Sequence, residues 1–268
     1  MMIIDVHTHI FPDDLALKAV PKMAQEAGIQ EAIDGRCSSL LQSMDTAGID
    51  KSWLQPVATK PAQVQSINIF VESLRSDRLI PFGGVHPDYE DLSKLIDDLA
   101  ERGFPGVKIH PEYHQCRPGD PRFTPLYEAL QANRMIALFH AGYDIGIPTI
   151  NSAPIDFVRL KDTYPQLTII LAHMGGFQQW EEVSNDLAGQ ADIYLDTSYS
   201  LGHFPDEEFV ALVRKHGVHR ILFGTDSPWA DQKKDVDYLT SLNFSDDELK
   251  AILGGNAQFL LEDQKNAG

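Results

Sequence analysis

The sequence predicts an α/β protein of the (β/α)₈ barrel class, with its active site at the C-terminal ends of the strands. Short apolar and β-branched runs recur eight times, and most of the stretches between them have helical spacing with Gly or Pro punctuation. The length of 268 residues fits the roughly 250 residues typical of one such barrel. No linker, charge block or low-complexity segment interrupts the pattern, so we expect one domain over residues 1–268.

The eight runs give the expected strands in chain order. They are residues 3–7, 52–58, 79–86, 106–110, 135–140, 167–173, 192–197 and 220–226. Helix-like segments with one apolar stripe follow at residues 89–103, 125–134, 152–165 and 206–217. Residues 245–263 predict a capped helix, a glycine break and a short final helix. An open doubly wound sheet is the alternative, but no GxGxxG motif follows the first run.

Polar residues stand at or near the end of seven of the eight runs. They are His7 and His9, His86, Lys108 and His110, His140, His173, Asp196 and Asp226. In a parallel barrel, the C-terminal strand ends converge on one mouth, where the active sites of this fold lie. The sequence therefore directs imidazoles, an amine and carboxylates to a single point.

The spacing of the first two histidines suits a metal centre. Side chains two apart on a strand share a face, so His7 and His9 are expected to point inward, while Ile4 and Val6 meet the helix layer. Neutral imidazoles together with a carboxylate bind Zn²⁺, Fe²⁺ and Mn²⁺ well. We therefore predict a divalent metal ion at the mouth.

Charge narrows the range of partners. A net charge of −17 repels nucleic acid phosphates and anionic membranes, so a small-molecule substrate is expected, with no nucleic acid or membrane partner. Neither a signal sequence nor an apolar run of transmembrane length is visible, and we expect a cytoplasmic protein. A homo-oligomer is compatible with the sequence.

Six motifs together resemble the metal-dependent amidohydrolase superfamily, in particular its amidohydrolase-related (amidohydrolase-2) branch. They are DVHTH, GVKIHP, LFHAG, LAHMGG, LDTS and LFGTDSPW, and the resemblance covers nearly the whole chain. It implies that His7, His9, His140 and Asp226 ligate the metal, with His173 beside it. The last helix departs from the usual pattern, because Gln258 stands where an Arg often follows Asn-Ala.

For two further residues, Asp5 and His86, the sequence allows two interpretations each. Asp5, expected on the inward face with the leading histidines, either accepts a hydrogen bond behind the metal ligands or is a buried structural carboxylate. His86 either lies near the mouth, as in the TatD-like relatives, or is a turn histidine before Pro87.

Lys108 separates a one-metal site from a two-metal site. With His110 it is expected to face inward, while Val107 and Ile109 face outward. In some members of the superfamily this lysine is carboxylated and bridges two metals; alternatively Lys108 is a free cation for a substrate carboxylate, or pairs with an internal acid. We expect one metal, zinc first, with manganese or iron as alternatives.

The resemblance implies a hydrolase of a small amide, lactone or ester that uses a metal-activated water. Asp226 would move the proton, and His173 would hydrogen-bond the nucleophile or polarise the carbonyl. The alternative is a nonoxidative decarboxylase of a small unsaturated or aromatic acid, with Lys108 or Arg117 holding the carboxylate. A catalytically inactive metal-binding barrel is the third hypothesis.

Substrate contacts are expected from the loops that follow the strands. We predict that His110, Arg117, Tyr143 and Trp229 bind substrate. The loops also carry Tyr113, Phe177, Trp180 and Tyr199, and an aromatic roof suits a compact organic molecule.

Overall fold

Parallel strands form the centre of the protein. The structure is a computed structural model that describes residues 1–190 and 192–266. The strands are β1 (Ile4–Thr8), β2 (Lys51–Leu54), β3 (Leu79–Pro81), β4 (Gly83–Gly84), β5 (Gly106–Ile109), β6 (Ile136–Phe139), β7 (Thr168–Leu171), β8 (Ile193–Asp196) and β9 (Ile221–Leu222). β3 and β4 are the two halves of the strand predicted at 79–86, so each of the eight predicted strands is present.

Hydrogen bonds close these strands into a ring. Pairing runs β1–β2–β3 and β4–β5–β6–β7–β8–β9, and each of these pairs is parallel. Between β3 and β4, the Phe82 N–H donates to Leu54. At the other junction, the Val6 N–H donates to the Phe223 carbonyl and the Asp226 N–H donates to the His7 carbonyl. The predicted barrel is therefore confirmed.

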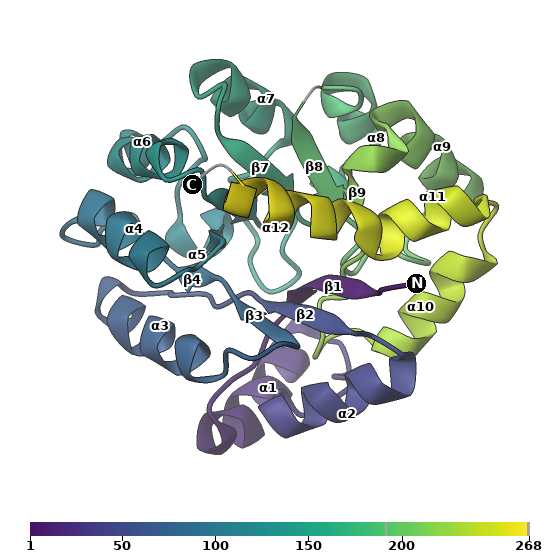
Figure 1. Ribbon diagram of the computed structural model, residues 1–268, viewed down its shortest axis with the longest axis horizontal. Coiled ribbons are helices and arrows are strands. Elements are labelled where there is room, and N and C mark those ends of the chain that lie inside the picture. The colour runs from purple at the N-terminus through teal and green to yellow at the C-terminus, as the bar shows by residue number, and fades with distance from the viewer. Residues whose placement is uncertain (191, 267–268) are drawn as a thin grey trace.

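Helices surround the ring (Figure 1). They are α1 (Asp13–Ala27), α2 (Cys37–Ala47), α3 (Val64–Ser73), α4 (Leu92–Glu101), α5 (Pro111–His114), α6 (Thr124–Ala132), α7 (Pro154–Thr163), α8 (Trp180–Glu182), α9 (Asp206–His216), α10 (Gln232–Ser241), α11 (Asp246–Lys250) and α12 (Asn256–Asn266). α4 shows why they form: its buried residues Leu92, Leu95, Ile96 and Leu99 have helical spacing, and the Asp91 side chain caps its first turn. No helix of residues 1–190 and 192–266 is long and apolar enough to cross a bilayer.

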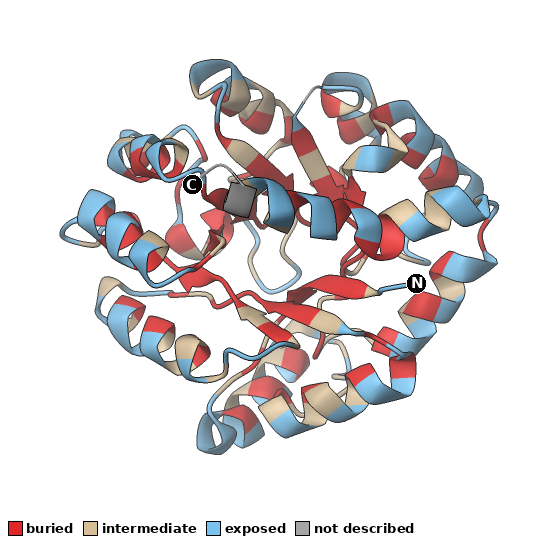
Figure 2. Cartoon of the chain, viewed as in Figure 1, coloured by how far each residue is buried: buried red, intermediate tan, exposed pale blue. Residues whose placement is uncertain are grey.

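The core has two apolar layers, and Figure 2 shows burial concentrated in the strands and on the inner faces of the helices. The outer layer packs strand residues such as Val107 and Ile109 against the helices, as predicted. The inner layer lies inside the ring and includes Ile136, Leu138 and Ile170. Lys108 alternates with Val107 and Ile109 and therefore faces inward.

α12 covers the N-terminal end of the ring. Ala257 and Leu260 pack into the inner layer, and the Gln264 side chain donates to the carbonyls of Pro105 and Arg134, just before β5 and β6. The opposite end, where the strands finish, stays open for a site.

The predicted glycine break in the C-terminal segment is wrong. A π-helical turn at Ala251–Gly255 joins α11 to α12 without interruption. Gly254 is needed there for close approach, since a Cβ would lie 2.3 Å from the Met2 carbonyl oxygen. The predicted cap is confirmed, because Ser245 and Glu248 form a capping box at the start of α11.

The predicted inward and outward faces of β1 need correction. Ile4 and Val6 lie in the inner layer, whereas Asp5 accepts hydrogen bonds from the side chains of Thr225 and Gln232, the latter on α10. The cause is a register shift between Asp5 and Thr8, which places an extra residue on β1 and reverses the alternation. Asp5 is thus a buried structural carboxylate, and burial raises its pKa to about 6.

The single domain predicted over residues 1–268 includes Ala191 and residues 267–268, which lie outside the described residues.

Candidate metal centre and cavity

A cavity of about 690 Å³ opens at the C-terminal ends of the strands. It brings together twelve of the residues named from the sequence, seven polar and five aromatic. They are His7, His9, Lys108, His110, His140, His173, Asp226, Tyr113, Tyr143, Phe177, Tyr199 and Trp229. Convergent polar groups inside a largely apolar cavity are typical of a binding or catalytic site.

His7, His9 and Asp226 form one group of potential metal ligands. One nitrogen or oxygen from each lies within 4.8 Å of the others. Asp226 Oδ1 is 3.0 Å from His9 Nε2 and 3.5 Å from His7 Nε2. Burial acts to raise the pKa of Asp226, but the hydrogen bond with His9 and the field of His7 lower it to about 2.

Neighbouring acceptors fix which ring nitrogen of these histidines carries the proton. His9 Nδ1 lies 2.6 Å from the Gln55 carbonyl, which only accepts, so this nitrogen is the donor. His7 Nδ1 likewise lies 2.9 Å from Asp196 Oδ2. In the neutral form of each ring, Nε2 therefore carries the lone pair on the side of Asp226, and a metal ion takes the place of the proton that His9 Nε2 otherwise shares with Asp226.

This arrangement fits a divalent metal ion. Two imidazole nitrogens and an ionised carboxylate face each other over 3.0–3.5 Å, and these are the donor types that a divalent ion takes in proteins. Carboxylate–histidine–metal chains also have this form, with the carboxylate behind the ligand. His7, His9 and Asp226 would hold the ion.

Asp196 is the carboxylate behind His7, a role that the sequence did not reveal although the residue is the last of β8. Its Oδ1 accepts hydrogen bonds from the backbone N–H groups of His173 and Ser198, and the Ser198 hydroxyl donates to the same oxygen. Asp196 is fully buried, and this burial raises its pKa despite the nearby His173. It orients His7 toward the cavity.

His140, the predicted fourth ligand, lines the same cavity but is not in the group of ligand atoms formed by His7, His9 and Asp226. Its Nδ1 is 3.1 Å from His173 Nε2, and its Nε2 is 3.7 Å from Glu112 Oε2. His173 Nδ1 in turn lies 2.9 Å from the Ser198 carbonyl. The structure therefore places the fourth predicted ligand in the same cavity but with its free nitrogen directed toward Glu112.

Around His140 lies a second group of potential ligands. His110, His140 and Asp144 each offer one atom within 4.8 Å of the other two. The rings of His110 and His140 stack with centroids 4.2 Å apart. Asp144 and the adjoining Glu112 were missed in the sequence because both follow the strands in loops and short turns, where no periodicity marks them.

Lys108 is buried at the base of the cavity, with 2 % of its surface exposed. Its Nζ lies 2.9 Å from His7 Nε2. Burial lowers the pKa of Lys108 to about 8, against the opposing effect of Asp196 and Asp226. An amine here can be cationic at neutral pH and contact a ligand next to the triad.

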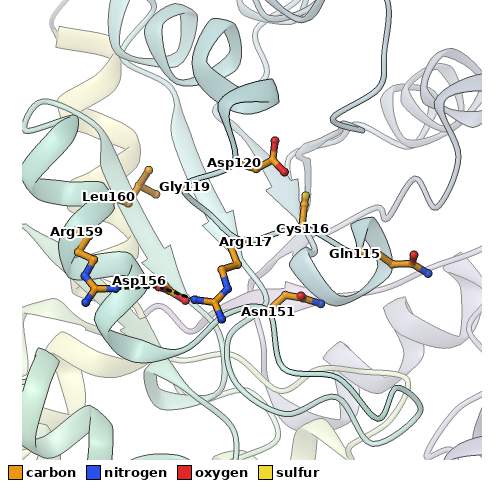
Figure 3. A pocket seen from close by; sticks show the side chains of 9 residues that line it. All are labelled: Gln115, Cys116, Arg117, Gly119, Asp120, Asn151, Asp156, Arg159 and Leu160. Atoms are coloured by element: carbon orange, nitrogen blue, oxygen red, sulfur yellow. Dashed lines mark ion pairs between the residues drawn. The ribbon is translucent and has the colours of Figure 1, made fainter.

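Arg117 lies outside this cavity, contrary to its predicted role. It lines a second cavity of about 480 Å³ with Asp156 and Arg159, shown in Figure 3. The Arg117 guanidinium is 3.8 Å from Asp156 Oδ1 and largely exposed. The reason is that Gln115 ends α5 in the left-handed conformation, and the chain then leads away from the mouth.

His86 and Trp180 are also not among the residues that line the central cavity. His86 Nδ1 accepts a hydrogen bond from the Asp88 N–H, which fits the interpretation of His86 as a turn histidine before Pro87. Trp180 stacks on Phe204 and donates to the His173 carbonyl, so it packs beneath the site. Tyr113 and Phe177 do line the cavity, with Tyr143, Tyr199 and Trp229.

Comparison with known protein families shows to which family the chain belongs. The family model described as amidohydrolase matches residues 4–262.

The chain belongs to the amidohydrolase family.

Several solved structures have the same barrel fold. An uncharacterized TIM-barrel protein from Bordetella bronchiseptica has a TM-score of 0.83 at 20% identity, covering 99% of this chain and 100% of that one. The 2,6-dihydroxybenzoate decarboxylase from Rhizobium has a TM-score of 0.73 at 17% identity, covering 98% and 99%. A Polaromonas dihydroxybenzoic acid decarboxylase with bound manganese and the inhibitor 2-nitroresorcinol has 0.72 at 18%, covering 97% of each. No curated protein matches the chain in sequence.

Proposed function

We propose that this amidohydrolase-family enzyme is a metal-dependent, nonoxidative decarboxylase of a small unsaturated or aromatic carboxylic acid. The observation that carries the proposal is the buried Lys108 amine, 2.9 Å from His7 Nε2 at the base of an aromatic-lined cavity. A buried cation beside a metal triad is what a carboxylate substrate needs. The structural neighbours named above as decarboxylases of dihydroxybenzoates support this reading over hydrolysis, our first expectation.

In the proposed reaction, the residues of the cavity bind the substrate and supply a proton. Lys108 binds the substrate carboxylate, and the rings of Tyr143 and Trp229 pack against the flat organic body. His173 supplies the proton: Nδ1 keeps its own proton for the Ser198 carbonyl, so the ring takes a second proton from solvent on Nε2 and passes that one to the substrate. That proton forms a C–H bond at the ring or alkene carbon, the C–C bond to the carboxylate breaks, and CO₂ leaves.

His7, His9 and Asp226 would hold the divalent ion, with His140 as the fourth ligand that the family resemblance implies. When bound, such an ion polarises oxygen atoms of the substrate or of water. Manganese in a structural neighbour supports this class of ion, and zinc and iron suit the same donors.

Hydrolysis is the second candidate, and one observation favours it. Asp226 Oδ1 lies 3.0 Å from His9 Nε2 and 3.5 Å from His7 Nε2, so a carboxylate that can accept a proton from water lies next to the ligands of the ion. The small-molecule substrate and the cytoplasmic location expected from the sequence remain parts of the proposal.

The test uses metal-stripped protein reloaded with Mn²⁺. We expect it to release ¹³CO₂ from carboxyl-labelled hydroxybenzoates and to incorporate one solvent deuteron into the product in D₂O. Lys108→Met should lower kcat/KM by about 100-fold or more, since a buried charge partner is lost. Lys161→Met is the matched control, because Lys161 is half-buried and bonds the Leu167 carbonyl outside the cavity.

The other outcomes decide between the alternatives. Incorporation of ¹⁸O from labelled water into product without CO₂ would establish hydrolysis. A protein that binds metal and turns over neither acids nor amides, lactones and esters would be the inactive barrel.

A further inference from the structure

We propose that the substrate carries an alkyl chain, and that the part of the central cavity formed by α1 and α3 binds this chain. We call this part the apolar arm, and it is lined by Leu15, Met23, Ala27, Ile29, Ile67 and Phe70. The inference rests on the proposed function for the carboxylate end of the substrate. It narrows the substrate class to acids whose ring bears an apolar tail.

The cavity has two ends of different chemistry. The histidines, Lys108 and Asp226 follow or end the strands and form its polar end. α1 and α3, which lie on the same side of the ring (Figure 1), supply most of the apolar arm. Because both sets of side chains line one cavity, a ligand bound at the polar end has direct access to the arm.

Tyr113 shows that the two ends adjoin. Burial raises the pKa of its hydroxyl to about 12, and the carboxylates of Asp144, Glu26 and Asp226 add to this effect. Glu26 belongs to α1, and Asp226 to the metal triad. One hydroxyl therefore lies in the electric field of both ends.

α1 has more apolar surface than it buries. Ala16, Val20 and Ala24 recur every four residues and are buried in the protein. Leu15 and Met23 lie beside this stripe and line the arm. Leu15 is nevertheless 50 % exposed, so an apolar ligand in the arm would remove further apolar surface from water.

α3 repeats this arrangement. It buries Val64 and Val71, whereas Ile67 and Phe70 are only partly buried and line the arm. Ile69 projects from the other side of the helix and is 64 % exposed. Two helices thus present partly buried apolar side chains to the same space.

Polar side chains at the edge of the arm are already engaged by the protein. Glu26 forms an ion pair with Lys22 at 3.6 Å. Gln63 Oε1 accepts from the N–H and the hydroxyl of Thr59, both at 3.0 Å. The Ser66 hydroxyl donates to the Gln63 carbonyl. The arm therefore offers apolar contact rather than hydrogen bonds, and a hydrocarbon chain gains most from it.

The size and direction of the cavity agree with a tailed acid. Its volume of about 690 Å³ is in the range that encloses drug-sized ligands, whereas a single ring with one carboxylate displaces about five waters, roughly 150 Å³. Lys108, at the base, is 2 % exposed, whereas Leu15 lies near the opening. A chain para to the carboxylate points away from Lys108 and follows this direction.

The experiment compares resorcinol with 5-pentylresorcinol as ligands of the Mn²⁺-loaded full-length protein, by calorimetry. They are the products of 2,6-dihydroxybenzoate and of the same acid with a para pentyl chain, and neither can lose CO₂. Each buried methylene contributes up to about 4-fold in affinity. We expect the pentyl chain to tighten binding by about 10-fold or more, and kcat/KM for the pentyl acid to rise by a similar factor.

Two matched pairs of variants test where the chain binds. Leu15 and Leu17 are both exposed on α1, but only Leu15 lines the arm; Ile67 and Ile69 are the corresponding pair on α3. Leu15→Asn and Ile67→Asn should each weaken pentylresorcinol binding by about 5- to 10-fold and leave resorcinol within about 2-fold. Leu17→Asn and Ile69→Asn should bind both ligands like the wild type. Circular dichroism checks folding, and gel filtration gives the oligomeric state.

The inference is overturned if the chain adds less than about 10-fold, if all four variants lose its effect equally, or if neither resorcinol binds. A wild-type dimer that only Leu15→Asn and Ile67→Asn convert to monomers would also overturn it, because a second copy would then fill the arm. Release of CO₂ from 2,6-dihydroxybenzoate with no effect of the chain would remove the arm and keep the proposed function. Chain-dependent binding without CO₂ release would support the arm and contradict decarboxylation.

Discussion

Three of the histidines that line the cavity, His7, His9 and His173, have the proton on Nδ1 fixed by an acceptor behind the ring. Gln55 and Ser198 use backbone carbonyls for His9 and His173, and Asp196 uses a carboxylate for His7. Because carbonyls and carboxylates only accept here, the opposite nitrogens are left with lone pairs directed into the cavity. The metal-binding form of the site is thus prepared by Gln55, Asp196 and Ser198, which lie behind the histidines.

Asp196→Asn tests this arrangement. An asparagine can present its amide N–H to His7 Nδ1, which then no longer has to carry the proton, so His7 Nε2 loses its obligatory lone pair. We expect Mn²⁺ affinity to fall by about 10- to 100-fold, measured by calorimetry. Asp156→Asn is the control with the same chemical change, and equal affinity in all three proteins would contradict the role given to Asp196.

The polar residues at strand ends could be predicted because strand runs are visible in sequence. His7, His9, Lys108, His140, His173 and Asp226 follow or end such runs, and a parallel barrel brings them together. The role of Asp196, and the presence of Glu112 and Asp144, could not be predicted. Their partners lie far along the chain, as with Asp196 and His7, and only the folded register joins them.

At the scale of elements, the register shift in β1 decides which side chains reach the mouth. Strict alternation would direct Asp5, His7 and His9 to one face, but the extra residue between Asp5 and Thr8 leaves Asp5 on the helix side. Sequence alternation alone cannot show such a bulge, because the pattern of apolar residues is the same with or without it. The error therefore affected Ile4, Val6 and Asp5 together.

The loops after β6 and β7 are held against each other by one glycine. Gly142 has φ +86°, and a Cβ there would lie 2.2 Å from the Phe177 nitrogen. We expect Gly142→Ala to lower the free energy of unfolding by at least about 3 kcal/mol, through backbone strain and collision, measured by urea denaturation.

Gly48→Ala is the matched control for that variant. Gly48 has φ +73° but nothing within 4 Å of the added Cβ, so it should cost only about 1–2 kcal/mol of left-handed strain. Equal losses in the two variants would show that the loops do not pack as described.

At the scale of the whole molecule, one end of the barrel is closed by a helix and the other carries the candidate site. α12 closes the N-terminal end with Ala257 and Leu260, and the metal-binding side chains occupy the other. The barrel class could be predicted from eight strand runs. The position of α12 could not be predicted, because it depends on contacts of Gln264 with residues just before β5 and β6.

Acid stability gives a prediction away from the site. His216 is buried; its Nε2 lies 2.8 Å from the Ile193 carbonyl and its Nδ1 accepts from the Gly189 N–H. Burial lowers its pKa to about 4. Below about pH 6.5, His216 is protonated in the unfolded chain but stays neutral in the folded chain. The folded state is therefore stabilised less, relative to the unfolded state, as pH falls from about 6.5 toward 4.

The comparison with His216→Gln isolates that contribution. Between pH 7 and pH 5, the stability advantage of the wild type over the variant should shrink by about 2 kcal/mol, measured by urea denaturation at each pH. His219→Gln, at an exposed position nearby, is the control. An advantage that stays constant with pH would contradict the buried, neutral His216.

One measurement bears most directly on the claim that side chains from separate strands jointly bind a divalent ion. Crystals of the protein grown with excess Mn²⁺ should show an anomalous peak about 2.2 Å from His7 Nε2, His9 Nε2 and a carboxylate oxygen of Asp226. A map without a peak among these three residues, from crystals in which the ion is in excess, would contradict the account.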